Sequence, residues 1–355
     1  MPAGKPGNRS TPLGFGIIGC GMIANFHAKA INLARGARLV GVVDRTEDKV
    51  RAFAAKHKVA FWSTKLADLL ARPDLHVICV TTPSGLHLEP SLAAIRAGKH
   101  LVVEKPLEIT LARVDELLRA AEAAGVQVAA VFQARFGAGA QKIKAALQAG
   151  RFGRLVLCSA YVKWHRTAEY YQGSWHGTLA LDGGGALINQ SIHAIDLLQW
   201  FAGMPVEVFA WKTRRVHTRI EAEDTAVASL RFADGALGTI EGSTALYPGW
   251  RRRLEICGEH GSTVLEEDRI TRWEFRRSDM GDEAVLAGQA TSSMGSGASA
   301  PDQIDFQGHL LQIQDLVDSL LEGRAPALDG RQARKAVALV RALYASAEAN
   351  APVRL

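Results

Sequence analysis

The sequence lacks a long hydrophobic run, and this absence argues against a protein that spans a membrane through helices. No window of its 355 residues approaches the run of about 20 apolar residues that a membrane-spanning helix needs. The first residues, MPAGKPGNRSTPLG, include basic side chains but not the apolar centre of a signal peptide. We therefore expect a soluble protein that is not exported and has no membrane partner.

Cysteine is scarce, and the basic residues do not cluster. Because the four cysteines lie far apart in apolar stretches, neither a disulfide framework nor a CxxC metal knuckle is indicated, and the reducing cytoplasm is the expected location. The formal net charge is +6, and the only run of basic residues is Arg251–Arg253. This mild excess suits an anionic cofactor and argues against a nucleic-acid partner. The cysteines are Cys20, Cys79, Cys158 and Cys257.

The first third of the chain alternates short apolar runs with amphipathic stretches. A composition of 48% hydrophobic and 22% charged residues is that of a globular protein, and the length favours two domains. Continuous apolar runs indicate strands buried on both faces of a parallel sheet, with helices between them. We predict a doubly wound α/β domain over residues 13–136. Its predicted strands are Phe15–Ile18, Leu39–Val43, Val77–Thr81, Leu101–Val103 and Val126–Phe132.

The pattern of predicted strands and helices changes after residue 136 and predicts an α+β domain over residues 137–355. After a helix at 138–149 and a long strand at 155–164, a helix is expected near 187–201, followed by five strands joined by tight turns. Such strands predict a large, mainly antiparallel sheet with helices on one face only. The other face of the sheet must be exposed to solvent or contact a second subunit, and we expect the latter, which makes the protein a homo-oligomer.

The segment Gly288–Ala300 is low-complexity and predicted to be a flexible loop. Two closing helices, Phe306–Glu322 and Gln332–Asn350, are free to pack on either domain.

The first chemical motif is a glycine turn between a strand and a helix. Gly19 permits a tight turn, Gly21 allows the backbone to approach a pyrophosphate, and Ala24 allows close packing of helix and strand. Met22 and Ile23 complete the turn. The pattern GxGxxA is weak by itself, and an unrelated glycine turn is the alternative.

A carboxylate twenty positions further on strengthens the prediction of a dinucleotide site. Asp44 ends the second strand, where it would accept the adenosine ribose hydroxyls. Because a carboxylate repels a 2′-phosphate, NAD is favoured over NADP. Arg45 beside it leaves NADP possible, since a guanidinium can bind that phosphate.

Two further clusters follow the fourth and fifth strands, at the sheet edge where ligands bind. The first, TTPSGLH, contains Thr82, Pro83 and His87; a lone histidine of this kind is more often a structural hydrogen-bonding residue than an acid or base. In the second, Lys105 stands between Glu104 and a proline, where a nicotinamide ring would lie. Burial and a positive ring would make Lys105 a proton-transfer group, and a surface salt bridge with Glu104 is the alternative.

The fourth cluster, DGGGALINQSIHAID, has three glycines that lead into a helix. Asn189 and His193 are spaced i, i+4 and are expected on one helical face, where they could present an amide and an imidazole to a substrate hydroxyl. Asparagine is a poor zinc ligand and no further ligand accompanies this pair, so no metal is expected.

The richest polar and aromatic stretch runs from Lys163 to His176 and is the candidate substrate loop. Tyr171 and Trp175 would pack on a sugar ring, and Arg166 would hold a carboxylate or phosphate. The alternative is that the tryptophans of this stretch only close the domain core.

With these clusters placed, the chain resembles the glucose–fructose oxidoreductase / inositol dehydrogenase / rhizopine catabolism (Gfo/Idh/MocA) family over nearly its whole length. The resemblance rests on GCGMIA, on TPSGLHLEPSLAAIRAGKHLVVEKP, on GGGALINQSIHAID and on the closing HLLQIQDLVDSLLEGRAPALDG. It implies NAD(P)-dependent oxidation or reduction of sugars, sugar acids or cyclitols. It also implies a Rossmann domain followed by an open-sheet domain that mediates dimers or tetramers.

The resemblance assigns roles residue by residue. It places Glu104 near the nicotinamide ribose, makes Lys105 and His193 the catalytic lysine and acid/base histidine, and puts Arg135 in the substrate cleft. The amine of Lys105 and the imidazole of His193 are then expected to meet where the nicotinamide projects. The remaining residues assigned to the cofactor are Gly19, Gly21, Met22, Ile23, Asp44, Arg45, Thr82, Pro83 and His87.

One position departs from many members of the family, which have an aspartate where this chain has Asn189. An amide binds a hydroxyl but cannot take its proton, so proton transfer falls to His193 and Lys105. The expected reaction moves a hydride from a secondary alcohol to the nicotinamide while His193 accepts the hydroxyl proton. A non-catalytic sensor on the same fold and an NAD-dependent glycosidase are the alternatives.

Overall fold

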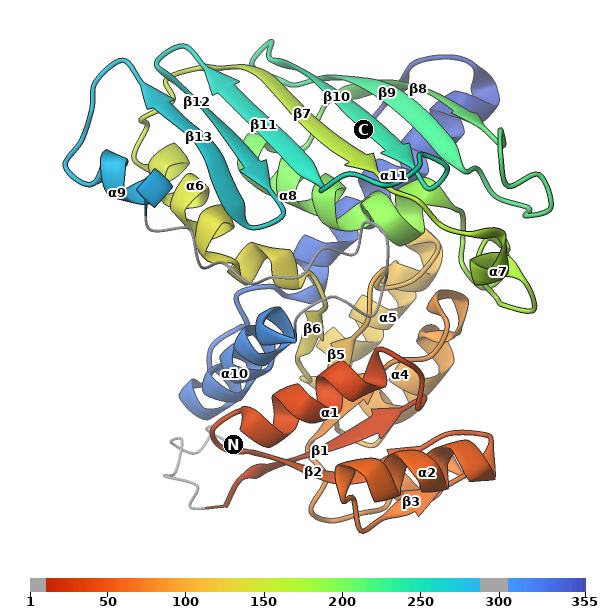
Figure 1. Ribbon diagram of the computed structural model, residues 1–355. Coiled ribbons are helices and arrows are strands. Elements are labelled where there is room, and N and C mark those ends of the chain that lie inside the picture. The colour runs from red at the N-terminus through yellow and green to blue at the C-terminus, as the bar shows by residue number, and fades with distance from the viewer. Residues whose placement is uncertain (1–10, 288–305) are drawn as a thin grey trace. The chain divides into compact units, whose positions relative to one another are not determined.

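The computed structural model describes residues 11–287 and 306–355, which form two compact units (Figure 1). Unit 1 contains residues 11–133 and 306–334, and unit 2 contains residues 134–287 and 335–355. The low-complexity segment Gly288–Ala300 lies outside the described residues.

Unit 1 is built on a six-stranded sheet in the order β3-β2-β1-β4-β5-β6, with every pair of strands parallel. The five strands predicted from apolar runs are confirmed, and β1 and β4 are buried along their whole length, as two covered faces require. The two-residue strand β3 was not predicted, because it is too short to form an apolar run. The strands are β1 Leu13–Ile18, β2 Ala37–Val43, β3 Trp62–Ser63, β4 Val77–Val80, β5 His100–Val103 and β6 Val128–Ala130.

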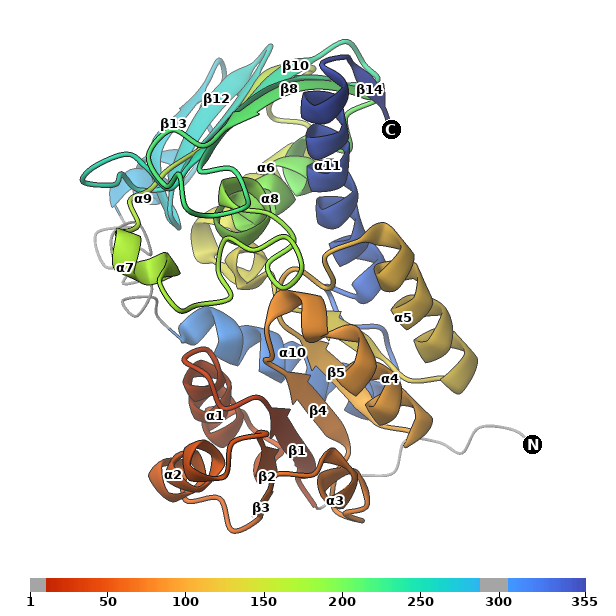
Figure 2. The same ribbon diagram turned by 90° about the vertical axis from the view of Figure 1, so that its right-hand side faces the viewer.

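Helices cover both faces of this sheet, and their ends follow local sequence signals. Helix α5 begins after Thr110, whose side chain accepts the backbone N–H of Arg113, and ends at Gly125 in the left-handed region. Helix α10 packs beside α1 (Figure 2), where Ile313 and Leu316 join the core of the unit. The closing helix predicted at Phe306–Glu322 therefore belongs to unit 1. The helices are α1 Ala24–Leu33, α2 Glu47–His57, α3 Leu66–Leu70, α4 Leu88–Arg96, α5 Leu111–Ala124 and α10 Gln307–Glu322, with a 3-10 turn at Ser84–Leu86. A further 3-10 turn, Gln133–Phe136, begins at the last residue of this segment and continues into unit 2.

Unit 2 is built on an eight-stranded sheet in the order β13-β12-β11-β7-β10-β9-β8-β14. Its pairs are antiparallel, as predicted, except that β7 and β10 are parallel. A parallel pair requires a long connection, and helices of the unit lie between these two strands in the chain. The strands are β7 Leu155–Lys163, β8 Glu207–Thr213, β9 Thr225–Arg231, β10 Leu237–Ser243, β11 Arg253–Gly258, β12 Gly261–Glu266, β13 Arg269–Phe275 and β14 Val353–Arg354. The last two were not predicted, because β13 is rich in charge and β14 is very short.

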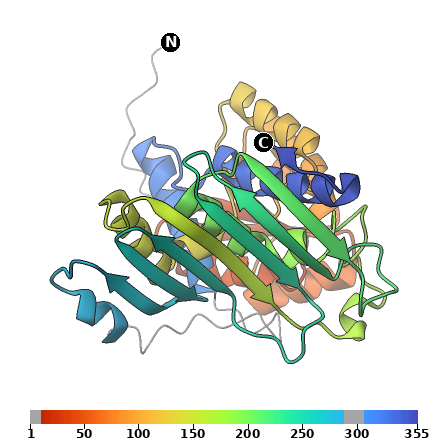
Figure 3. The same cartoon turned by 90° about the horizontal axis from the view of Figure 1, so that it is seen from above.

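The helices of unit 2 pack on one face of its sheet, and no helix of residues 11–287 or 306–355 packs on the other face (Figure 3). Alternate residues such as Ala160 and Leu254 are buried on the inner face, whereas Trp211 and Val227 are exposed on the outer face. The helices are α6 Ala138–Gln148, α7 Ala168–Tyr171, the π-helix η3 Ala186–Ser191, α8 Ile192–Ala202, α9 Asp282–Ala287 and α11 Gly330–Ala349, whose first residues belong to unit 1. In the described part of the chain, no helix has the length and apolarity that crossing a membrane requires.

Candidate active site

The turn between β1 and α1 contains two glycines whose surroundings differ. Gly19 has a φ of +92°, and an added Cβ there would lie 2.9 Å from the carbonyl oxygen of Thr81. At Gly21 an added Cβ would meet no atom within 4 Å, so the backbone at this point is open. The turn leads directly into α1 after Ile23, and the side chain of Met22 is exposed. An open backbone at a helix N-terminus fits the pyrophosphate of a dinucleotide.

Asp44 lies directly after β2, where its carboxylate is held close to the glycine turn. Its Oδ2 accepts the backbone N–H of Cys20 at 2.8 Å and its Oδ1 accepts that of Thr46 at 3.0 Å. Lys49, which the sequence analysis did not single out, forms an ion pair with Oδ2 at 3.2 Å. Burial would raise the pKa of Asp44, but the two N–H groups and Lys49 outweigh it and lower the pKa. The side chain is therefore a carboxylate, as acceptance of ribose hydroxyls requires.

His87 links the turns that follow β4 and β5. Its Nδ1 lies 2.9 Å from the carbonyl oxygen of Pro106, and its Nε2 lies 3.0 Å from that of Thr82. The ring is buried, and burial lowers its pKa. His87 is therefore a structural hydrogen-bonding residue, as its sequence context favoured. Its ring connects Thr82 and the adjoining Pro83 to the segment after Lys105. Contact with the cofactor stays a prediction.

Glu104 and Lys105 lie at the carboxyl end of β5, the edge of a doubly wound sheet where ligands bind. The side chain of Lys105 is half-buried. Glu104 is 5% exposed, and its Oε1 lies 2.8 Å from Nε2 of His27. Its Oε2 accepts the backbone N–H of Lys105 at 3.1 Å. A surface salt bridge is therefore not the role of Glu104.

The helix that carries Asn189 and His193 begins as a π-helix, which sequence periodicity did not reveal. Its N-terminal N–H groups are satisfied by a buried carboxylate, because Glu223 accepts hydrogen bonds from Gly185 at 3.1 Å and from Leu187 at 2.9 Å. The hydroxyl of Tyr344 donates to Glu223 at 2.8 Å. A π-helical turn often marks a functional site.

Asn189 is part of a polar network rather than a separate amide. Its Nδ2 donates to Oδ1 of Asp182 in a short hydrogen bond, and its Oδ1 accepts from Gln190 at 3.0 Å. Asp182 therefore places a carboxylate beside the position where many family members have an aspartate. His193 is half-buried in the first turn of α8. We missed Asp182 because its proximity to Asn189 depends on how the three glycines turn.

The loop after β7 adds a buried cation and aromatic rings to this network. Arg166 is 3% exposed and donates to Oε1 of Gln190 at 2.9 Å, and burial lowers its pKa. The ring of Tyr170 stacks on His176 with centroids 4.5 Å apart, and the hydroxyl of Tyr171 donates to Thr244 at 2.9 Å. The ring of Trp175 contacts that of His176, and Trp164 is buried in the core. The structure thus connects most of the predicted substrate residues of unit 2 through hydrogen bonds and ring contacts.

Arg135 has a structural role in unit 2. Its Nε and Nη2 atoms each lie 2.7 Å from a carboxylate oxygen of Asp196, and the guanidinium lies over the ring of Trp200. Both partners are on α8, so the pair fixes this helix to the 3-10 turn Gln133–Phe136. Contact between Arg135 and a substrate stays a prediction.

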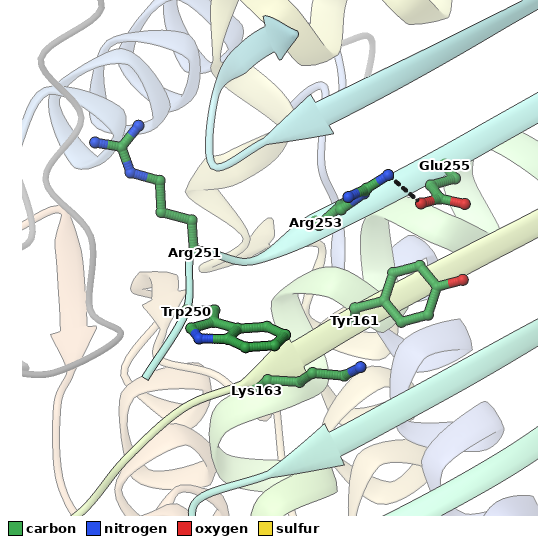
Figure 4. A pocket seen from close by; sticks show the side chains of 6 residues that line it. All are labelled: Tyr161, Lys163, Trp250, Arg251, Arg253 and Glu255. Atoms are coloured by element: carbon green, nitrogen blue, oxygen red, sulfur yellow. Dashed lines mark ion pairs between the residues drawn. The ribbon is translucent and has the colours of Figure 1, made fainter. Parts of the chain in front are cut away.

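A shallow pocket lies on the outer face of the unit 2 sheet (Figure 4). Arg253 and Glu255 form an ion pair there at 2.6 Å. The helix α8, with His193, packs on the opposite face of the same sheet, so we do not assign this pocket to the reaction. The pocket is lined by Tyr161, Lys163, Trp250, Arg251, Arg253 and Glu255.

Comparisons with known proteins agree with this architecture in both units. The model for the oxidoreductase family with an NAD-binding Rossmann fold matches residues 13–132, and the model for the GFO/IDH/MocA C-terminal domain matches residues 140–264. The myo-inositol 2-dehydrogenase of Thermotoga maritima is 27% identical over 350 residues, which are 96% of this chain and 98% of that protein. The 1,5-anhydro-D-fructose reductase of Ensifer adhaerens is 29% identical over 70% of this chain and 74% of its own length.

Solved structures extend the similarity to almost the whole chain. The WlbA dehydrogenase from Bordetella pertussis, in complex with NADH and UDP-GlcNAcA, has 32% sequence identity and a TM-score of 0.88, covering 98% of each chain. The chain is therefore an NAD-binding enzyme and belongs to the Gfo/Idh/MocA family of oxidoreductases.

Proposed function

We propose that this chain is an NAD-dependent dehydrogenase that oxidises a secondary alcohol of a sugar or sugar acid to a ketone. The observation that carries this proposal is the similarity over 98% of the chain to the WlbA dehydrogenase, which was solved with NADH and UDP-GlcNAcA. The guanidinium of Arg166 in the predicted substrate loop supports an anionic group on the substrate, because a planar guanidinium binds a carboxylate or phosphate through two parallel hydrogen bonds. Nucleotide-linked sugar acids are thus the first class to test.

The glycine turn and Asp44 are proposed to hold NAD, which supplies the hydride acceptor when bound. The open backbone at Gly21 and the charged carboxylate of Asp44 fit its pyrophosphate and ribose. The carboxylate of Asp44 repels a 2′-phosphate, which supports NAD over NADP, and the ion pair with Lys49 offsets part of this repulsion.

Lys105 and His193 are proposed to serve the same substrate hydroxyl. As the C–H bond breaks and its electron pair leaves with the hydride, His193 takes the hydroxyl proton and the C–O bond becomes a carbonyl. Lys105 donates a hydrogen bond to the same oxygen and stabilises its negative character. Asn189 is held by Asp182 and Gln190, so its proposed role is to fix the polar network beside the substrate.

A substrate screen tests the proposal. Purified protein with NAD is offered UDP-GlcNAcA, myo-inositol, free uronic acids and neutral sugars, and NADH absorbance is followed. We expect NADH to form with at least one of these substrates. NAD and sugar binding by calorimetry without NADH formation would favour the sensor, and release of chromophore from chromogenic glycosides would favour the glycosidase.

The outer face of the unit 2 sheet is proposed to pair with the same face of a second copy. One cross-strand row on this face combines exposed apolar side chains with charges of both signs, as a self-complementary twofold interface needs. The row runs through Trp211, Val227, Glu241, Tyr161 and Arg253.

A further inference from the structure

Three buried side chains from distant parts of the sequence meet in unit 1. His27 lies on α1, Glu104 follows β5, and His309 lies on α10, and they are 1%, 5% and 2% exposed. Oε1 of Glu104 lies 2.8 Å from Nε2 of His27 and 3.7 Å from Nε2 of His309. The two imidazole rings lie edge to face, with centroids 5.3 Å apart. The carboxylate is thus held between two helices.

The contacts fix the charge of this cluster. Burial alone would raise the pKa of Glu104, but the two imidazoles lower it well below its usual range, so the group is a carboxylate. Burial lowers the pKa of His27, so this ring is neutral and donates its Nε2–H to Glu104. A buried carboxylate is costly unless it is hydrogen-bonded, and the hydrogen bonds come from His27 and from the backbone N–H of Lys105. The imidazole of His309 lies beside the carboxylate at 3.7 Å, which is longer than a hydrogen bond.

The second oxygen of Glu104 connects the cluster to Lys105. Oε2 accepts the backbone N–H of Lys105 at 3.1 Å. The backbone position of Lys105 is therefore coupled to the rotamer of Glu104. That rotamer is held by the hydrogen bond to His27, with the ring of His309 packed beside both groups. A rotation of Glu104 would release the N–H of the residue that we propose to contact the substrate oxygen.

We propose that His27 and His309 are positioning residues that set the geometry of Lys105 through Glu104. This role rests on the proposed function, because it assumes that Lys105 contacts the substrate. Neither histidine needs to touch substrate or cofactor. Their effect is to hold one carboxylate in one rotamer, so that the Lys105 ammonium is placed before substrate binds.

The same three side chains form a possible donor set for zinc, but the contact between His27 and Glu104 favours a direct hydrogen bond over a shared metal ion. Two donors bound to one tetrahedral zinc lie about 3.3 Å apart, given metal–ligand distances of about 2.0–2.1 Å. The contact between His27 and Glu104 is 2.8 Å, which is the distance of a charge-assisted hydrogen bond.

Paired substitutions separate positioning from simple stability. His27→Gln keeps a donor toward Glu104, whereas His27→Leu removes it. His309→Gln and His309→Leu form the second pair, which tests whether a polar side chain is needed 3.7 Å from the carboxylate. We expect the leucine variants to lose at least about tenfold in kcat, because small displacements of a catalytic group have effects of this size. The glutamine variants should keep a kcat within about threefold of the wild type.

A double-mutant cycle with Glu104→Gln tests whether the effect of His27 on kcat requires the Glu104 carboxylate. If His27 acts only through Glu104, His27→Leu should lower kcat little further in a Glu104→Gln background. Additive losses would overturn the proposal. Equal losses in the leucine and glutamine variants, matched by equal losses in Tm, would also overturn it, because that pattern is expected of a packing role.

A readout without substrate distinguishes failure of this inference from failure of the proposed function. Acetylation of Lys105 at fixed pH, resolved by mass spectrometry, reports the environment of its amine directly. We expect the leucine variants to change this rate and the glutamine variants to keep it, whether or not a sugar is turned over. An unchanged rate in all four variants, or stoichiometric zinc in the wild-type protein by elemental analysis, would overturn the inference.

Discussion

Gly19 and Gly21 stand two positions apart in one turn, yet they lack a side chain for different reasons. Gly19→Ala should lower the free energy of unfolding by about 1–3 kcal/mol, because the residue has a positive φ and no room for a Cβ. Gly21→Ala should unfold like the wild type but bind NAD at least about tenfold more weakly, because only the ligand needs that space. Urea unfolding and fluorescence titration with NAD measure the two effects. Equal loss of stability in both variants would contradict this assignment.

Lys105 is the residue on which turnover should depend most. Lys105→Ala should lower kcat by at least about a hundredfold, because it removes a group that acts on the reacting oxygen. The Kd for NAD should stay near that of the wild type. Lys56→Ala, which removes an exposed lysine of α2, is the matched control and should leave both constants unchanged. Unchanged turnover in Lys105→Ala would reject the role.

Asp44 should make stability depend on pH in the acid range. Its folded pKa is lowered, so its contribution is complete above its unfolded pKa of about 4 and is lost as the pH falls through the folded value. The difference in unfolding free energy between the wild type and Asp44→Asn should therefore be constant above about pH 5 and shrink below about pH 4. Urea unfolding across this range measures it. A difference that grows on acidification would contradict the sign.

At the scale of elements, the π-helix η3 depends on side chains far from it in the sequence. Tyr344→Phe removes a hydroxyl that donates to Glu223 and accepts from the N–H groups of Gly185 and Ile188. We expect a loss of about 1–3 kcal/mol in unfolding free energy, because buried donors and an acceptor lose their partner. Tyr247→Phe is the control, since Tyr247 is 84% exposed. Similar losses in both variants would show that the hydrogen bonds of the Tyr344 hydroxyl do not contribute to the free energy of unfolding.

Elements with strong local signals were predicted well. Helix α5, one of the helices expected between the predicted strands, begins after a threonine cap and ends at a glycine. The helix expected near residues 187–201 instead begins as a π-helix, and β7 pairs in parallel with β10. Both differences come from partners elsewhere in the fold, which periodicity does not encode.

At the scale of the whole molecule, the outer face of the sheet should determine assembly. Val227→Lys places a charge in the centre of the proposed interface, where burial without a partner is costly. We expect the wild type to be a dimer or tetramer by light scattering and the variant to shift toward monomer. Ala55→Lys, on an exposed position of α2, should leave the mass unchanged. A monomeric wild type would reject the interface.

The sequence by itself determined those features that depend only on residues close together in the chain. The glycine turn, Asp44 and the strand ends that carry Glu104 and Lys105 follow from spacing, because consecutive residues at the carboxyl end of a buried parallel strand reach the same sheet edge. The family and the use of NAD follow from the same local motifs.

Only the tertiary structure decided which distant groups meet. His27 and His309 look like ordinary residues of amphipathic helices until α1 and α10 pack together around Glu104. Asp182 comes beside Asn189, and Tyr344 comes beside Glu223, only after the chain has folded back on itself. These contacts depend on helix packing and glycine geometry summed over the whole unit, so no local pattern encodes them.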